Sequence, residues 1–142
     1  MTDCIFCRIL AGELTGTFVY RDDVCAAFMD IQPVNPGHVL VVPVRHATRL
    51  ADMNAESAAR LMAVAHRVAA ALRASGVRCE GVNLLLSDGE AAMQEVPHAH
   101  LHVIPRWRGD GFGLRFGPDY KRRPPRAALE EVAARLRPAL DA

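Results

Sequence analysis

The sequence has no apolar run that approaches the length of a membrane span. Its first residues, MTDCIFCRIL, also place an acid where a secretory signal peptide carries basic residues. Both absences predict a soluble chain with a cytoplasmic address and no membrane partner. With 142 residues, of which 51% are hydrophobic, the chain is long enough to bury the core of a single domain.

A strong excess of one charge is also missing, because the formal net charge is only +1. Nucleic-acid-binding domains usually carry a larger basic excess, so we expect no nucleic-acid partner. Residues 106–126 are nevertheless locally basic, with seven Lys and Arg residues against two Asp residues. This window fits either a small anionic ligand or a solvated surface loop.

Cysteine is scarce, and two of the four cysteines, Cys4 and Cys7, form a CxxC pair. In a reducing compartment such a pair indicates metal or redox chemistry before a structural disulfide. The glycine-rich GxxxxGK phosphate loop is absent as well, so any nucleotide must be recognised by another device.

Apolar patterning predicts the secondary structure. A short helix follows the CxxC and ends near Gly12, and a helix over residues 55–74 is capped by Asn54. We expect strands at 18–22, 24–30, 38–44, 82–87 and 98–104, and a terminal helix within 127–140. The predicted class is α+β, a five-stranded, mostly antiparallel sheet with one long helix packed on it and short N-terminal and C-terminal helices.

Three of the six histidines, His98, His100 and His102, alternate with apolar residues between Pro97 and Pro105. Residues two apart on a strand share a face, so the three imidazoles line one side and the apolar residues point into a core. Such a row suits either a metal site or nucleophilic and acid–base catalysis. The spacing does not decide between them.

A ring nitrogen can attack phosphorus at neutral pH if the other nitrogen carries the proton and donates it to a backbone carbonyl. The segment before the histidines contains Ser87, Gly89 and Gln94, whose polar groups could hold an anion. We therefore expect phosphate chemistry at this strand.

Two segments, PGHVLVVPVRH and GVNLLLSDGEAAMQEVPHAHLHVIPR, resemble the histidine triad (HIT) nucleotide hydrolases and transferases. The resemblance covers about residues 3–112 of a single HIT-like domain, 1–142, and leaves 113–142 as a C-terminal extension with a helix. HVIPRW followed by GDGF is most similar to the Fhit branch and its bacterial relatives.

The resemblance implies that His100 attacks the α-phosphorus of AMP-containing substrates and forms a covalent nucleotidyl-histidine. His98, His102 and Gln94 complete the catalytic set, and the reaction requires no Mg²⁺. Dinucleoside polyphosphates and nucleoside phosphoramidates are both candidate substrates. The alternatives are a non-enzymatic nucleotide-binding regulatory module and a catalytic metal held by the three histidines.

For nucleotide binding, the resemblance implies that Asp30 accepts hydrogen bonds from the ribose. Ser87 and Gln94 would contact the phosphate. An apolar slot for the base would be formed by Ile5, Phe6, Ile9, Phe28, Ile31 and Leu40. Most of these apolar residues are equally well explained as core. Met93 stands where relatives often carry Gly, and would either narrow the pocket or pack beneath the loop.

A structural Zn²⁺ site is a separate hypothesis, with Cys4, Cys7, His46 and His98 as four nitrogen and sulfur ligands. It would pin the N-terminal segment to the sheet and leave His100 free. His38 is expected to be a structural, hydrogen-bonding residue. Members of the family usually pair, so we expect a homodimer.

Overall fold

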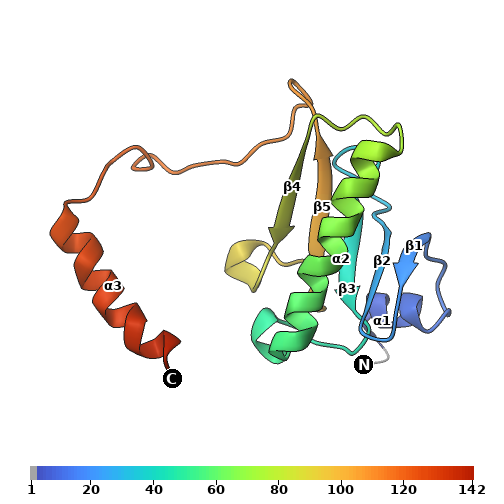
Figure 1. Ribbon diagram of the computed structural model, residues 1–142, viewed down its shortest axis with the longest axis horizontal. Coiled ribbons are helices and arrows are strands. Elements are labelled where there is room, and N and C mark those ends of the chain that lie inside the picture. The colour runs from blue at the N-terminus through green and yellow to red at the C-terminus, as the bar shows by residue number, and fades with distance from the viewer. Residues whose placement is uncertain (1–2) are drawn as a thin grey trace. The chain divides into compact units, whose positions relative to one another are not determined.

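The computed structural model describes residues 3–142 and divides into two compact units, one ending at Phe112 and one running from Gly113 to Ala142. The first unit contains a five-stranded antiparallel sheet in the order β1-β2-β3-β5-β4 (Figure 1). Its elements are α1 (Ile5–Leu10), β1 (Phe18–Arg21), β2 (Cys25–Met29), β3 (Val39–Pro43), α2 (Ala55–Ala74), β4 (Gly81–Leu86) and β5 (Leu101–Arg106). This architecture confirms the predicted α+β class.

The long helix α2 covers one face of the sheet. Asn54 caps it, because the side-chain oxygen accepts a hydrogen bond of 2.8 Å from the amide of Ser57. The residues that α2 buries recur at helical spacing: Leu61, Val64, Ala65, Val68 and Leu72. They pack against Val41, Leu101 and Val103 of the sheet in the larger of two apolar clusters. Leu101 and Val103 therefore point into this core, as expected, whereas Ala99 is buried but lies outside this cluster.

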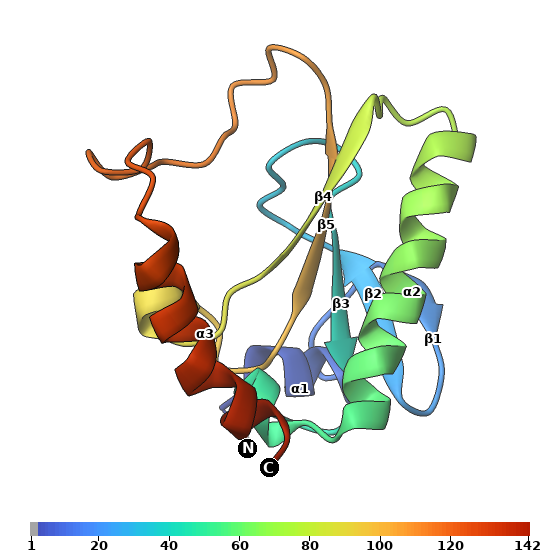
Figure 2. The same ribbon diagram turned by 60° about the vertical axis from the view of Figure 1, so that its left-hand side comes forward.

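The short helix α1 packs on the opposite face of the strands (Figure 2). Phe6 of α1 meets Phe28 of β2 edge to face, with ring centroids 5.4 Å apart. Leu40 of β3 belongs to the same apolar cluster and lies directly opposite His102 of β5. Because cross-strand partners share a face of the sheet, His102 also lies on the α1 side.

Strand β5 differs at both ends from the strand expected over 98–104. It begins at Leu101, because the preceding backbone bonds outside the sheet: the amide of Ala99 donates to the carbonyl of Ala47 over 2.7 Å. It also runs through Pro105 to Arg106. The proline is tolerated because Val103 is the last residue of β5 that pairs with β3. The ladder between these two strands therefore needs no N–H from residue 105.

The second unit contains helix α3 (Arg126–Leu140), which fills the range 127–140 where a terminal helix is predicted and begins one residue earlier. Its large apolar residues, Leu129, Val132, Leu136 and Leu140, are all exposed. Among residues 3–142, no helix is both long and apolar enough to cross a membrane.

Candidate active site

The three histidines of the HAHLH segment lie together on the α1 face. His98 is completely buried, His100 is 6% exposed, and His102 is partly buried. The ring centroids of His100 and His102 are 4.8 Å apart. The ring of Phe6 meets His100 edge to face, with a centroid separation of 5.2 Å. His98 and His100 precede Leu101, the first residue of β5. The bend at Pro97 therefore contributes to the placement of their rings.

Hydrogen bonding assigns the proton on His100. Its Nδ1 lies 2.7 Å from the carbonyl oxygen of His98. A carbonyl only accepts, so Nδ1 donates and carries the proton. In the neutral imidazole the lone pair is then on Nε2. This arrangement is the one expected for a ring that attacks phosphorus without a strong base.

A second chain of hydrogen bonds assigns the proton on His102. The amide of Val34 donates to Nδ1 of His38 over 3.0 Å, so the proton of neutral His38 is on Nε2. That Nε2 lies 2.9 Å from Nδ1 of His102. Since His38 donates there, neutral His102 carries its own proton on Nε2 and can donate it to an anion. His38 is therefore a hydrogen-bonding residue, as expected.

Burial keeps both of these rings neutral. Desolvation, together with smaller contributions from the neighbouring His100 and His38, lowers the pKa of His102 to about 4 against the opposing effect of Asp30. Desolvation also lowers the pKa of His38, against the opposing effect of Asp30, whose carboxylate lies 3.5 Å from Nε2. The uncharged hydrogen-bond chain is thus the state present near neutral pH.

The four residues predicted to bind zinc lie together. Donor atoms of Cys4, Cys7, His46 and His98 are all within 4.8 Å of one another, so this cluster could hold a metal ion. Nδ1 of His98 is 3.4 Å from Sγ of Cys4, and Nδ1 of His46 is 3.2 Å from Sγ of Cys7.

The surroundings orient both rings of the cluster. Nε2 of His98 donates to the carbonyl of Pro43 over 2.9 Å, which leaves its Nδ1 lone pair for a ligand bond. Nε2 of His46 lies 3.3 Å from the hydroxyl of Thr48. Burial and the neighbouring Cys4 together raise the pKa of Cys7 to about 11, and a bound cation would reverse that shift by favouring the thiolate.

The predicted base-binding residues separate into two sets. Phe6, Phe28 and Leu40 are buried in the apolar cluster under α1, with Ile9 packed against them. Ile5 is 44% exposed and Ile31 is 90% exposed, and both lie outside that cluster. Their contact with a base stays a prediction.

The polar residues predicted to contact the nucleotide have these neighbours. The carboxylate of Asp30 accepts from the amide of Gln32 over 2.8 Å as well as facing His38, and Ser87 directly follows β4. The side-chain nitrogen of Gln94 donates to the carbonyls of Thr48 and Val96, at 2.6 and 3.0 Å. Gln94 therefore fastens its own loop here, and its role toward phosphate stays a prediction.

Met93 adopts a left-handed backbone conformation, with φ of +64°. This explains why glycine suits the position, because only glycine adopts such a φ without strain. The Met93 side chain is 80% exposed, so it does not pack beneath the loop.

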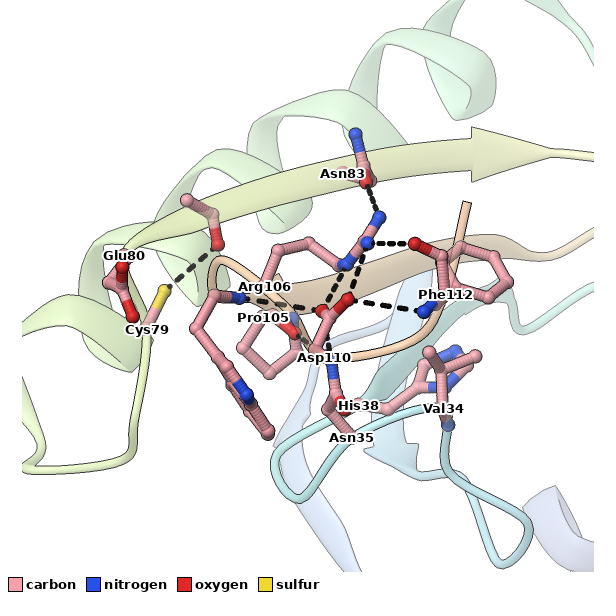
Figure 3. A network of polar contacts seen from close by, with 12 residues as sticks. Val34, Asn35, His38, Cys79, Glu80, Asn83, Pro105, Arg106, Asp110 and Phe112 are labelled. Carbon is pink, nitrogen blue, oxygen red and sulfur yellow. Dashed lines mark hydrogen bonds and ion pairs between the residues drawn. The ribbon is translucent and has the colours of Figure 1, made fainter. Parts of the chain in front are cut away.

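Sequence reasoning missed a buried polar network beside the site, formed by Arg106, Asp110 and Asn35 (Figure 3). The sequence pattern places Arg106 only in the locally basic window 106–126. Its guanidinium is bound to the carboxylate of Asp110 and to Asn83, so it is not free for a ligand. The sequence signal for the network was the segment GDGF, which places Asp110 four residues after Arg106.

Known proteins resemble this chain over most of its length. Residues 11–109 match the HIT domain family. An uncharacterized HIT-like protein of Borreliella burgdorferi is 42% identical over 118 residues, which are 82% of this chain and 85% of the relative. The adenosine 5'-monophosphoramidase of Schizosaccharomyces pombe is 32% identical over 137 residues, 94% of this chain and 98% of that enzyme.

The crystal structure of a Zn-bound histidine triad family protein from Mycobacterium smegmatis superposes with a TM-score of 0.76 at 39% identity. The match covers 94% of this chain and 97% of that one. The three adjacent histidines, the sheet that carries them and these relatives lead to one conclusion: the chain belongs to the histidine triad (HIT) family.

Proposed function

We propose that this protein is a nucleotide hydrolase or nucleotidyltransferase that cleaves AMP-containing substrates at the α-phosphate, through a covalent intermediate on His100. The observation that carries the proposal is the 2.7 Å hydrogen bond from Nδ1 of His100 to the carbonyl of His98. It leaves the Nε2 lone pair of a neutral imidazole as a nucleophile that needs no general base.

In the first step, Nε2 of His100 attacks the α-phosphorus, and the bond from phosphorus to the leaving group breaks. The leaving group departs with the bonding electron pair and takes up a proton from solvent. In the second step, water or another acceptor attacks the same phosphorus and releases its proton to solvent, and the P–N bond breaks with its electron pair returning to Nε2, which restores the neutral imidazole. Nε2–H of His102 would stabilise a non-bridging oxygen throughout, and the scheme requires no Mg²⁺.

Nucleoside phosphoramidates are the preferred substrate class. One relative that matches nearly the whole chain is named an adenosine 5'-monophosphoramidase. Dinucleoside polyphosphates carry additional anionic groups that would need cationic partners. Arg106 is already neutralised by Asp110, so it offers none.

Zinc is the metal that fits the cluster of Cys4, Cys7, His46 and His98. Two thiolates and two imidazoles are the ligand types of structural zinc sites, and a related HIT protein is described as Zn-bound. The bound ion would fix the ring of His98. Because the carbonyl of His98 holds His100, the site would support the nucleophile without contacting substrate.

A substrate panel tests the proposal. An AMP phosphoramidate and a diadenosine polyphosphate are assayed with the wild type, His100→Ala, and the control His66→Ala, whose histidine is exposed on α2. We expect turnover of the phosphoramidate, a loss of about a thousandfold or more in His100→Ala, and no change in His66→Ala. Nucleotide binding without turnover of either compound would instead favour the regulatory module.

A further inference from the structure

We propose that Asn35 and Asp110 are positioning residues that fix the loop carrying His38 and thereby set which ring nitrogen of His102 carries the proton. The inference rests on the proposed function, because the proton on His102 matters only if the site binds phosphate. Neither residue contacts the histidine triad directly. Both act through the loop between β2 and β3.

The network starts at an ion pair between the partly buried Arg106 and the buried carboxylate of Asp110. The carboxylate of Asp110 is 2% exposed and accepts from the guanidinium of Arg106, with Nη2 to Oδ1 at 2.8 Å. It also accepts from the amide of Phe112 at 3.2 Å. The Arg106 guanidinium holds the pKa of Asp110 well below its ordinary range, so this carboxylate stays ionised. The pair forms a rigid acceptor at the end of β5.

Asn35 attaches the loop to that end of β5. It is 5% exposed, and its side-chain amide donates twice, to Oδ2 of Asp110 at 2.8 Å and to the carbonyl of Pro105 at 2.9 Å. The carbonyl of Pro105 has no partner from β3, whose pairing ends at Val103. Asn35 thus supplies a hydrogen bond that the sheet does not, and Figure 3 shows it beside Asp110 and His38.

Two hydrogen bonds connect this loop to His38. The amide of His38 donates to the carbonyl of Asn35 at 3.1 Å, and the amide of Val34 donates to Nδ1 of the His38 ring at 3.0 Å. Val34 and Asn35 are thus both hydrogen-bonded to His38. Because the Val34 amide is what forces the His38 proton onto Nε2, moving this loop would release the His38–His102 chain.

Gly37 shows how closely this loop lies on the core. It has φ of +99°, and a Cβ atom there would stand 2.8 Å from Cγ1 of Val77. The loop therefore has little room to settle elsewhere while remaining packed. Polar attachment through Asn35 and close packing at Gly37 specify the same path.

The test is the protonation pattern of the histidine rings, measured by ¹⁵N NMR on the full chain near neutral pH. Protonated and lone-pair ring nitrogens have distinct shifts, so each tautomer is read directly. In the wild type we expect the protons of His38 and His102 on Nε2. In Asn35→Ala we expect His38 to become a mixture of tautomers and kcat to fall about tenfold to a hundredfold, with a smaller change in KM.

Asn83→Ala is the matched control. Asn83 accepts from Nη1 of Arg106 at 2.6 Å, so its removal disturbs the same guanidinium but leaves Asn35 bonded. It should retain the wild-type tautomers and kcat. Asp110→Asn changes the partner of Asn35 instead of Asn35 itself. It should shift the tautomer population of His38 in the same direction as Asn35→Ala. It serves as the second variant if Asn35→Ala does not fold.

Unchanged tautomers and kcat in both Asn35→Ala and Asp110→Asn would overturn the inference. So would a wild-type His38 with its proton on Nδ1, or equal effects in Asn83→Ala. A wild type that turns over no substrate would refute the proposed function instead. The NMR result would then still decide whether Asn35 positions the ring.

Discussion

Single residues decide the chemistry of this site through the position of one proton in each ring. Backbone groups at Val34 and His98 assign the protons of His38 and His100, and the proton of His102 follows from its bond to His38. These backbone partners do not titrate. The tautomers of the proposed nucleophile and of the proposed phosphate donor are therefore set by the fold and persist across the pH range in which the rings are neutral.

The buried rings predict how stability depends on pH. A histidine in the unfolded chain titrates near its ordinary value of 6.5, whereas burial lowers the pKa of His102 to about 4. Between these values the unfolded chain binds more protons, so stability falls as the pH falls from 6.5 toward 4. We expect His102→Gln to lose less stability on acidification, with a drop in Tm over this range about 10 °C smaller than that of the wild type.

Thermal unfolding at several pH values measures this difference. His66→Gln is the control, because His66 is exposed on α2 and its curve should run parallel to that of the wild type. The groups that face His102 are His100, His38 and Asp30, and all three are retained in the variant. Parallel curves for His102→Gln and the wild type would show that burial does not hold this ring neutral.

At the scale of elements, α1 depends on the cluster at its N-terminal end. A helix of six residues is too short to be stable by itself. Phe6 and Leu10 anchor it by packing, and Cys4 and Cys7 anchor it to the rings of His46 and His98. Occupation of the cluster by a metal should therefore stabilise α1 more than the rest of the sheet.

We expect one zinc ion per chain in protein purified without chelator, measured by elemental analysis. Cys7→Ser should lose the zinc, and chelation should increase amide exchange in α1 before it does in α2. Cys79→Ser is the matched control, because Cys79 lies outside the cluster and should leave the zinc content unchanged. Absence of stoichiometric zinc from the wild type would refute the zinc site.

The elements were largely predictable because their signals are local. The apolar spacing and Asn54 cap of α2 coincide with the helix over Ala55–Ala74 that the structure contains. The start of β5 was not predictable, because a backbone bond to Ala47, far away in the sequence, draws the segment before Leu101 out of the sheet.

The histidines and the cysteine pair were visible in the sequence for the same reason, since their spacing within short segments carries the information. The contact between Asn35 and Asp110 was not visible, because 75 residues separate the two partners and the GDGF segment that contains Asp110 does not indicate which distant side chain meets it. Long-range polar contacts of this kind depend on how strands are brought together, which periodicity does not reveal.

At the scale of the whole molecule, the two faces of the sheet differ in what they carry. One face is closed by α2 and supplies the larger apolar core. The other carries α1, the metal-ligand cluster and the histidines. The two edges of the sheet are β1 and β4, and β4 exposes Leu84 and Leu85 along an open edge strand.

The homodimer remains a prediction, and β4 is the edge that we expect a second copy to cover. An exposed apolar edge strand favours pairing with another strand, and a lysine on it opposes pairing. Sedimentation should therefore show a wild-type dimer and a monomeric Leu84→Lys/Leu85→Lys variant. Val19→Lys, on the opposite edge strand β1, should remain dimeric. A monomeric wild type would contradict the prediction.

The most direct test of the central claim is to trap the intermediate. The protein is mixed with an AMP phosphoramidate, quenched within the first turnovers, digested and analysed by mass spectrometry. We predict an adenylyl group on the peptide that contains His100, released by mild acid and absent from His100→Ala. Turnover of the substrate with no adduct, or with the adduct on another residue, would contradict the account.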